Sequence, residues 1–214
     1  MLNHNEVFNL LKRRNRVEGL LGWEKTLIIV DWDDTLIPTT WMTNNKTFDL
    51  KNQQLGKIVA LFFQEATKLG EVVIITNADP SWVYEISERY LPEILFYLKK
   101  IPICSARQFA TKNPHDMVNW KFRAFYNVIQ CFCDKEEGLK KIISIGDSYW
   151  DRDAVFNVYE KNKKIEIVPK AVKFINSPTC EALCEQIIIL ISCLEEIVIC
   201  DGAKIYEMKT KLQV

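Results

Sequence analysis

The chain has 214 residues, of which 48% are hydrophobic and 26% are charged, a composition typical of a globular domain with a substantial core. Its 28 basic and 28 acidic residues cancel, so no overall basic field favours nucleic acid or a membrane surface as a partner. The longest nearly apolar run, "IIILISCL", is too short to span a bilayer, which needs about 20 residues. The seven cysteines are an odd number for a disulfide framework, and "CFC" and "CEALC" lack zinc-site spacing, so we expect a reduced intracellular protein.

Residues 1–24 are basic and amphipathic, and we expect them to form an N-terminal helical extension. They contain no secretory hydrophobic region, and Glu6 and Glu18 count against a mitochondrial transit peptide. The expected location is therefore cytoplasmic, with a mitochondrial location as the less favoured alternative.

After this extension, short runs rich in Val and Ile alternate with segments of helical periodicity. The expected strands are 26–31, 71–76, 101–106, 141–147 and 164–169. The expected helices are 52–70, 79–98 with a break at Pro92, 117–133, 149–162 and 177–194. Continuous apolar runs are typical of strands buried on both faces of a parallel sheet. The alternation predicts an α/β three-layer sandwich with a doubly wound, mainly parallel five-stranded sheet.

The expected organisation is one catalytic domain over 25–195 and a C-terminal hairpin or tail over 196–214 that packs on the same domain. The hairpin is predicted by Asp201-Gly202, which lies between two alternating runs in "EIVICDGAKIYEM". The connections between the expected strands are too short for a separate cap domain.

Polar residues follow several of the expected strands, and a lysine begins the helix before the fourth strand. These residues are Asp31, Asp33, Thr76, Asn77, Lys121, Asp147 and Asp151. In open α/β sheets, ligands bind beyond the carboxyl ends of the strands, so these side chains are expected at one edge. A cluster of aspartates such as "VDWDD" is costly when partly desolvated unless positive charge meets it there.

These residues fall in four segments that resemble the motifs of the haloacid dehalogenase-like (HAD) hydrolase superfamily. "IIVDWDDTL" resembles motif I, hhhhDxDxT, and "VVIITN" resembles motif II. "NWKFRAF" is similar to the motif III lysine segment, and "IISIGDSYWD" resembles motif IV, GDxxxD. All four occur in the family's order across roughly residues 25 to 175, and the chain is also similar to a largely uncharacterised eukaryotic group in that superfamily.

The resemblance implies a Mg²⁺-dependent phosphatase that forms an aspartyl-phosphate. Asp31 would be the nucleophile and Asp33 the general acid and base. The ligands of Mg²⁺ would be Asp31, the backbone carbonyl of Asp33, Asp147, and Asp151 either directly or through water. An acid at position 33 points away from dehalogenase and ATPase members of the superfamily.

Phosphate binding is assigned by the same resemblance to Thr76, Asn77 and Lys121. The absence of a large cap implies an open site for a bulky or macromolecular phosphorylated substrate, or a site closed by homo-oligomerisation. A small phosphorylated molecule stays open as a substrate. The alternative function is that of an interaction or scaffold protein with weak or vestigial catalysis.

Several residues have competing interpretations. Lys112 is a rival of Lys121 for the motif III role, and Asp153 is a rival of Asp151. Asp34 is expected to serve the turn or a helix cap rather than the site.

Thr35 is likewise expected to hold the turn by hydrogen bonds. Asn77 and Asp79 have a helix-capping alternative. The aromatic residues Trp41, Trp82 and Trp150 are interpreted as packing residues, with an alternative role as walls of the entrance.

Overall fold

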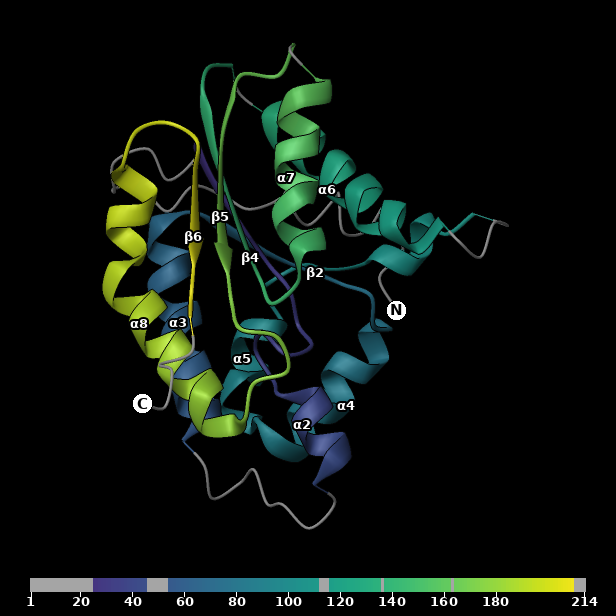
Figure 1. Ribbon diagram of the computed structural model, residues 1–214, viewed down its shortest axis with the longest axis vertical. Coiled ribbons are helices and arrows are strands. Elements are labelled where there is room, and N and C mark those ends of the chain that lie inside the picture. Colours follow the sequence, from purple (N-terminus) through teal and green to yellow (C-terminus); the bar gives the residue numbers. More distant parts are fainter. Residues whose placement is uncertain (1–24, 46–53, 112–115, 136, 163, 210–214) are drawn as a thin grey trace.

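Parallel strands form the centre of the computed structural model, which describes residues 25–45, 54–111, 116–135, 137–162 and 164–209. Within these ranges six strands make one sheet in the order β3-β2-β1-β4-β5-β6, all parallel (Figure 1). Their bounds are β1 Thr26–Val30, β2 Glu71–Thr76, β3 Ile103–Ser105, β4 Lys140–Gly146, β5 Ile167–Lys173 and β6 Lys204–Glu207.

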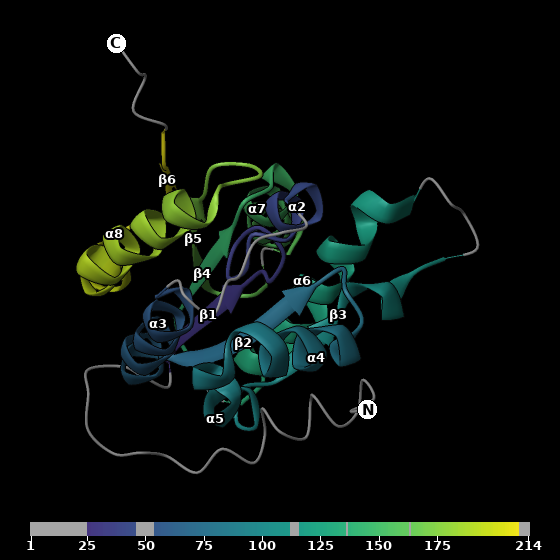
Figure 2. The same cartoon turned by 90° about the horizontal axis from the view of Figure 1, so that it is seen from below.

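Helices cover both faces of this sheet (Figure 2). One face carries α3 (Leu55–Leu69), α4 (Pro80–Tyr90), η3 (Pro92–Ile94), α5 (Leu95–Leu98) and α8 (Cys180–Ile199). The other face carries α6 (Met117–Cys133) and α7 (Tyr149–Lys161), while α2 (Thr39–Asn44) and η4 (Ala106–Phe109) follow β1 and β3.

Successive residues of the strands point to opposite faces and feed two separate apolar clusters. In β1, Ile28 and Val30 pack in the cluster beneath α3 and α8. Leu27 and Ile29 pack in the cluster beneath α6 and α7. The predicted three-layer α/β sandwich with a doubly wound parallel sheet is thereby confirmed.

Most of the predicted elements are present. The helix predicted over 117–133 coincides with α6. The break expected at Pro92 separates α4 from η3, because proline lacks the N–H that would continue the helix. The strand predicted to end at Pro169 instead continues to Lys173, and β5 begins at Ile167.

The predicted C-terminal hairpin is wrong. The run "EIVI" continues α8, with Leu194, Ile197 and Val198 buried at helical spacing. Asp201-Gly202 then leads from α8 into β6, which pairs in parallel with β5, and Gly202 has a φ of 78°. A short apolar run fits a helix as well as a strand, so periodicity alone misassigned it. The sheet therefore has six described strands instead of five, and the boundary expected at residue 195 falls inside α8.

The connection to β6 is also unusual in its hand. The helix α7 joins β4 to β5 on one face, while α8 joins β5 to β6, a step in the same direction, on the opposite face. The two crossovers therefore have opposite hands, although parallel crossovers are overwhelmingly right-handed. No local sequence pattern predicts a crossover of this handedness.

The described residues of the connections form no separate cap domain. Between β1 and β2 they form α2 and α3, and between β2 and α6 they form α4, the three short helices η3, α5 and η4, and β3. None of the described helices is long and apolar enough to cross a membrane. The extension expected over 1–24 lies outside the described residues.

Candidate functional site

The carboxyl ends of β1, β2 and β4 lie side by side at the point where the chain changes direction across the sheet. The strand β1 pairs with β2 on one side and with β4 on the other. Asp31 directly follows β1, Thr76 ends β2, and Asp147 directly follows β4. The predicted site residues thus come together at the switch point, where α/β sheets bind ligands.

Lys121 reaches this edge from α6 and lies between two carboxylates. Its Nζ is 2.9 Å from Asp31 Oδ1 and 2.6 Å from Asp151 Oδ1. All three side chains are buried. The positive charge expected beside Asp31 is therefore present, whereas the rival Lys112 lies outside the described residues.

Asp31, Asp147 and Asp151 form an acid cluster around Lys121. One carboxylate oxygen from each residue lies within 4.8 Å of the others. Lys121 pairs with Asp31 and Asp151, and the Lys173 ammonium at the end of β5 also acts on Asp147 and Asp151. With all three carboxylates ionised, at least one negative charge is therefore left unbalanced. Hard carboxylate oxygens without a His or Cys in the cluster suit a hard divalent cation such as Mg²⁺. Asp151, rather than Asp153, is the second acidic residue of this cluster.

Burial and mutual repulsion dominate the electrostatics of the acid cluster. Burial raises the pKa of Asp31 well above its usual range, although Lys121 acts in the opposite direction. Burial, and then the charge of Asp151, raise the pKa of Asp147 to about 6. Burial lowers the pKa of Lys121, but Asp151 and Asp31 outweigh it, so the net pKa lies above the usual value. The Lys121 ammonium therefore stays charged. The positive charge around the carboxylates is too small to offset their burial and mutual repulsion.

The turn after β1 is built by Asp34 and Thr35, as predicted. Asp34 adopts a left-handed conformation with a φ of 55°. Its carboxylate accepts the backbone N–H of Thr40 at 2.9 Å and so caps α2. Thr35 Oγ1 accepts the backbone N–H of Asp147 at 3.0 Å, which ties the loop after β1 to the loop after β4.

Asp151 is held by its own local sequence. Ser148 caps α7, and its hydroxyl donates to Asp151 Oδ2, while Lys121 occupies Oδ1. Gly146 leaves room for the carboxylate, because a Cβ at that position would lie 2.5 Å from Asp151 Cγ. Sequence reasoning missed Ser148, although a serine three residues before an aspartate at a helix start is a capping signal.

Asp33 lies apart from the acid cluster, beside residues of three other elements. Thr76 Oγ1 donates a long hydrogen bond, 3.5 Å, to Asp33 Oδ2. Burial raises the pKa of Asp33, and hydrogen bonds from Thr39 and Trp82 oppose that effect. The contact with Trp82 was not predicted, because no local pattern links the loop after β1 to α4. The backbone-carbonyl role expected of Asp33 stays a prediction.

The predicted phosphate-binding residues Thr76 and Asn77 lie at the end of β2 and at the start of the loop that follows it. Thr76 is fully buried, and its hydroxyl accepts the backbone N–H of Ala78 at 2.9 Å. The side-chain oxygen of Asn77 is buried and has no hydrogen-bond partner in the described part of the chain. Asp79, not Asn77, caps α4, with its carboxylate accepting the N–H of Ser81 at 2.9 Å.

The remaining sequence candidates lie outside the cluster. Asp153 is half exposed and pairs with Arg152 at 2.7 Å, as expected of a surface residue. Trp41 packs against the core, whereas Trp150 is exposed. Lys173, which was not predicted, is buried at the end of β5, where it donates to Phe174 O at 2.7 Å.

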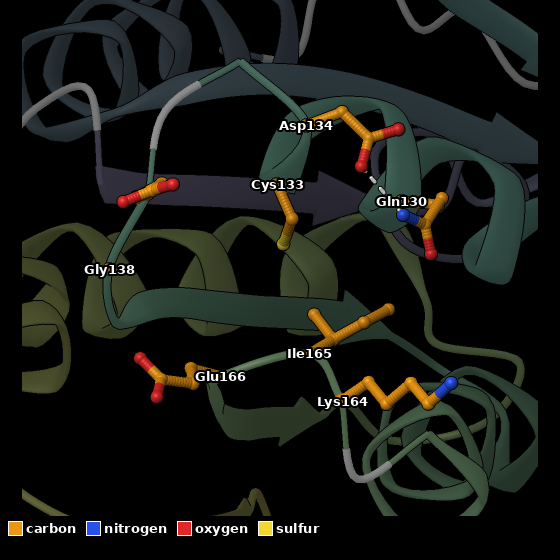
Figure 3. Close-up of a pocket in the computed structure, with 8 residues that line it drawn as sticks. Gln130, Cys133, Asp134, Gly138, Lys164, Ile165 and Glu166 are labelled. Atoms are coloured by element: carbon orange, nitrogen blue, oxygen red, sulfur yellow. Dashed lines mark hydrogen bonds between the residues drawn. The ribbon is translucent and has the colours of Figure 1, made fainter.

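A pocket of about 380 Å³ lies at the opposite end of the sheet (Figure 3). It is lined by the end of α6 and by the loops that precede β4 and β5, including Cys133, Glu137 and Glu166. Burial raises the pKa of the Cys133 thiol to about 11, so it stays protonated at neutral pH. The pocket is therefore separate from the acid cluster and presents no activated nucleophile.

Comparison with known proteins found no matching family model and no matching curated protein. The site must therefore be interpreted from its own residues and their contacts.

Proposed function

We propose that the chain is a Mg²⁺-dependent phosphatase that hydrolyses a phosphate monoester through an aspartyl-phosphate on Asp31. The observation that supports this best is the buried group of Asp31, Lys121, Asp147 and Asp151 at the switch point of the sheet. These residues belong to three of the four segments that resemble HAD motifs, and their charges are unbalanced in the way that a divalent cation would correct.

The acid cluster fits a magnesium ion by its donor atoms and its charge. Asp31, Asp147 and Asp151 would hold the ion, together with the backbone carbonyl of Asp33 that the HAD resemblance assigns. When bound, the ion would neutralise the repulsion between the Asp31 carboxylate and a phosphate dianion.

Lys121 and Thr76 would orient the phosphoryl group. The Lys121 ammonium is already fixed by Asp31 and Asp151, so it needs little reorganisation to donate a further hydrogen bond to a phosphoryl oxygen. Thr76 lies at the end of the neighbouring strand β2, where its hydroxyl accepts the Ala78 N–H.

The reaction would proceed in two displacements at phosphorus. In the first, an Asp31 oxygen bonds to phosphorus, the bond to the leaving oxygen breaks, and Asp33 donates a proton to that oxygen. In the second, water attacks phosphorus, Asp33 takes its proton, and the bond to Asp31 breaks to release inorganic phosphate. Asp33 suits this role because its side chain lies outside the acid cluster.

The substrate is proposed to be a bulky or macromolecular phosphate, such as a phosphoprotein. The short helix α2 and the start of α4 are the described elements beside Asp33, and no separate cap lies among the described residues. A large substrate can therefore approach the strand ends directly.

The test is Mg²⁺-dependent release of phosphate from p-nitrophenyl phosphate and from a phosphopeptide panel. Asp31→Asn should lower the rate at least about 10³-fold, because it removes the nucleophile. Asp153→Asn, a matched change on the exposed face of α7, should leave the rate unchanged. Trapping with beryllium fluoride should succeed with wild type and fail with Asp31→Asn. Equal rates for wild type and Asp31→Asn would reject the proposal and favour an interaction or scaffold role.

A further inference from the structure

Lys173 is a buried cation to which the proposed reaction gives no role. It is the last residue of β5 and is 7% exposed. Its ammonium donates to Phe174 O at 2.7 Å and to Asn176 Oδ1 at 2.5 Å, in the loop that follows β5. Both acceptors are uncharged. A buried ammonium held only by neutral acceptors is costly unless negative charge lies near it, so the nearest carboxylates decide what this lysine does.

The sheet register places Lys173 beside the acid cluster. Lys173 pairs with Gly146, the last residue of β4, and the Phe174 N–H donates to Gly146 O at 2.8 Å. Asp147 is the next residue of the chain after Gly146. Neighbouring strands lie about 5 Å apart, so the end of β5 adjoins the start of the loop that supplies Asp147.

The Lys173 side chain points to the face of the sheet that carries α7, which lies alongside β4 and β5 in Figure 1. Its neighbour Val172 packs in the cluster on the other face, and side chains alternate along a strand. The Lys173 Nζ lies 4.8 Å from the centroid of the Tyr149 ring, at the start of α7. Tyr149 lies midway between Asp147 and Asp151 in the sequence, so the ammonium reaches the segment that supplies both carboxylates.

The electrostatics agree with this placement. Burial dominates the raised pKa of Asp147, and Lys121 and Lys173 are the cations that act in the opposite direction. Burial lowers the pKa of Lys173, and Asp147 is the strongest of the charges that oppose this effect. Lys173 and Asp147 therefore interact through their charges, although the hydrogen bonds of Lys173 go to the loop after β5.

A fixed positive charge at this place has opposite consequences for the two ligands of the proposed site. It repels a divalent cation held by Asp147 and Asp151, because like charges repel across a medium of low effective dielectric constant. It attracts a phosphate dianion that approaches the same edge of the sheet. Lys121 differs from Lys173 in this respect, because its ammonium is in direct contact with Asp31 and Asp151.

We propose that Lys173 determines the ligand preference of the acid cluster by weakening the binding of Mg²⁺ and strengthening the binding of a phosphate dianion. The inference rests on the proposed magnesium-dependent phosphatase function. Lys173 acts through its charge on Asp147 and Asp151, without a ligand contact of its own. Since the attraction is twice as large for a dianion as for a monoanion, it favours phosphate monoesters over diesters.

Titration calorimetry of the full-length chain at pH 7.5 tests this role with two probes. The first is Mg²⁺ alone, and the second is inorganic phosphate added to the protein saturated with Mg²⁺. Lys173→Gln should bind Mg²⁺ about three- to tenfold more tightly and phosphate about three- to tenfold more weakly. Glutamine retains an N–H donor for the loop after β5. Damage to that loop would weaken the binding of both probes, so the opposite signs distinguish a role in charge from a role in structure.

Two matched variants serve as controls. Lys173→Arg retains the charge, so both dissociation constants should stay within about twofold of wild type. Lys141→Gln removes a lysine near the start of β4. That position is about 17 Å from Gly146 along the strand, beyond the Debye length of about 8 Å, so both constants should be unchanged.

The outcomes separate this inference from the proposed function. Wild type that binds Mg²⁺, combined with a Lys173→Gln variant that weakens both ligands or changes neither, would reject the role of Lys173 and leave the phosphatase proposal standing. Wild type that binds no Mg²⁺ would reject the magnesium site itself, and the role of Lys173 with it.

Discussion

Two buried lysines, Lys121 and Lys170, show how differently this fold can accommodate an ammonium group. The Nζ of Lys170 donates to the carbonyls of Ile197 and Val198, at 2.5 and 3.1 Å, and to that of Cys200. These oxygens lie at the end of α8, where carbonyls lack helical partners. Burial lowers the pKa of Lys170, whereas the pKa of Lys121 is raised.

The difference lies in the net charge around each lysine. Carbonyl dipoles satisfy Lys170 without adding a formal charge, so its surroundings are complete within the chain. The carboxylates around Lys121 add more negative charge than it can neutralise. A buried charge with complete partners serves the fold, and a buried group with excess charge indicates a ligand still to be bound.

Replacing Lys121 and Lys170 by methionine, one at a time, should distinguish a ligand-binding lysine from a structural one. Lys121→Met should have the largest combined effect on turnover and stability of all the variants considered. Lys121→Met should lower phosphate release about 10²- to 10³-fold, because it removes the cation that we propose binds the phosphoryl group. It should also destabilise the metal-free protein by about 3 to 5 kcal/mol, because buried carboxylates lose their partner. Lys170→Met should cost about 1 to 3 kcal/mol in stability yet retain turnover in the folded protein.

The measurements are kcat/KM and urea denaturation for both variants at pH 7.5. Equal losses of turnover per folded molecule would contradict the distinction between Lys121 and Lys170.

Gly146→Ala tests whether the position of Asp151 in the acid cluster depends on the absence of a side chain at residue 146. The added Cβ would lie 2.5 Å from Asp151 Cγ and 2.6 Å from its Cβ, so the first turn of α7 must shift. We expect a loss of about 1 to 3 kcal/mol in stability, and at least about tenfold in turnover as Asp151 moves from Lys121.

Gly202→Ala is the control for this variant. Gly202 has a φ of 78° in the turn before β6, so alanine should reduce stability there while turnover stays unchanged. Equal turnover for the two alanine variants would show that Asp151 tolerates the displacement.

The sequence could predict the features that depend on neighbouring residues or on the general rules of parallel sheets. Asp31 and Asp147 were brought together correctly because strand ends share one edge of a parallel sheet. Lys121 was assigned to the same edge from its place at the start of the helix before the fourth strand and from the HAD resemblance. Asp34 and Asp79 were recognised as capping residues because caps depend on neighbours a few residues away.

Features that depend on distant partners were missed. The strand β6 pairs with β5 after a crossover of unusual hand, which no local pattern encodes. The hydrogen bond between Thr35 and Asp147 joins loops that are 112 residues apart. The contact between Trp82 and Asp33 was also missed, because the sequence around Trp82 indicates a helix and favours a packing role for its side chain.

Asp147→Asn should stabilise the metal-free protein. The pKa of Asp147 is about 6 in the folded protein, above the ordinary value of about 4, so the folded state binds the extra proton between these pH values. The ionised carboxylate is therefore destabilising, fully above about pH 6 and not at all below about pH 4. The shift corresponds to at most about 3 kcal/mol, and the partial exposure of the side chain reduces our expectation to about 1 to 2 kcal/mol.

Thermal denaturation of wild type and Asp147→Asn at pH 7.5 and 4.5, with EDTA or Mg²⁺, measures this effect. The variant should have the higher Tm in EDTA at pH 7.5, and the difference should shrink at pH 4.5. Mg²⁺ should raise the Tm of wild type more than that of the variant. A variant less stable than wild type in EDTA would show that the carboxylate contributes a favourable interaction even without a metal ion.

The smallest expected effect concerns Asp34, which lies in the same "VDWDD" segment as Asp31 but serves the fold. Asp34→Ala should lower the free energy of unfolding by about 1 to 2 kcal/mol. It removes the carboxylate that accepts the Thr40 N–H of α2, and it places alanine, which has no side-chain hydrogen bond to offset the strain, at a φ of 55°. Asp34→Asn should stay within about 0.5 kcal/mol of wild type, because asparagine retains a capping oxygen and tolerates the left-handed conformation. Both variants should keep the full increase in Tm on addition of Mg²⁺, which the Asp31→Asn variant should lose. If Asp34→Asn lost that increase as well, Asp34 would have to be counted with the metal site, and the division of this segment into a catalytic and a structural aspartate would be wrong.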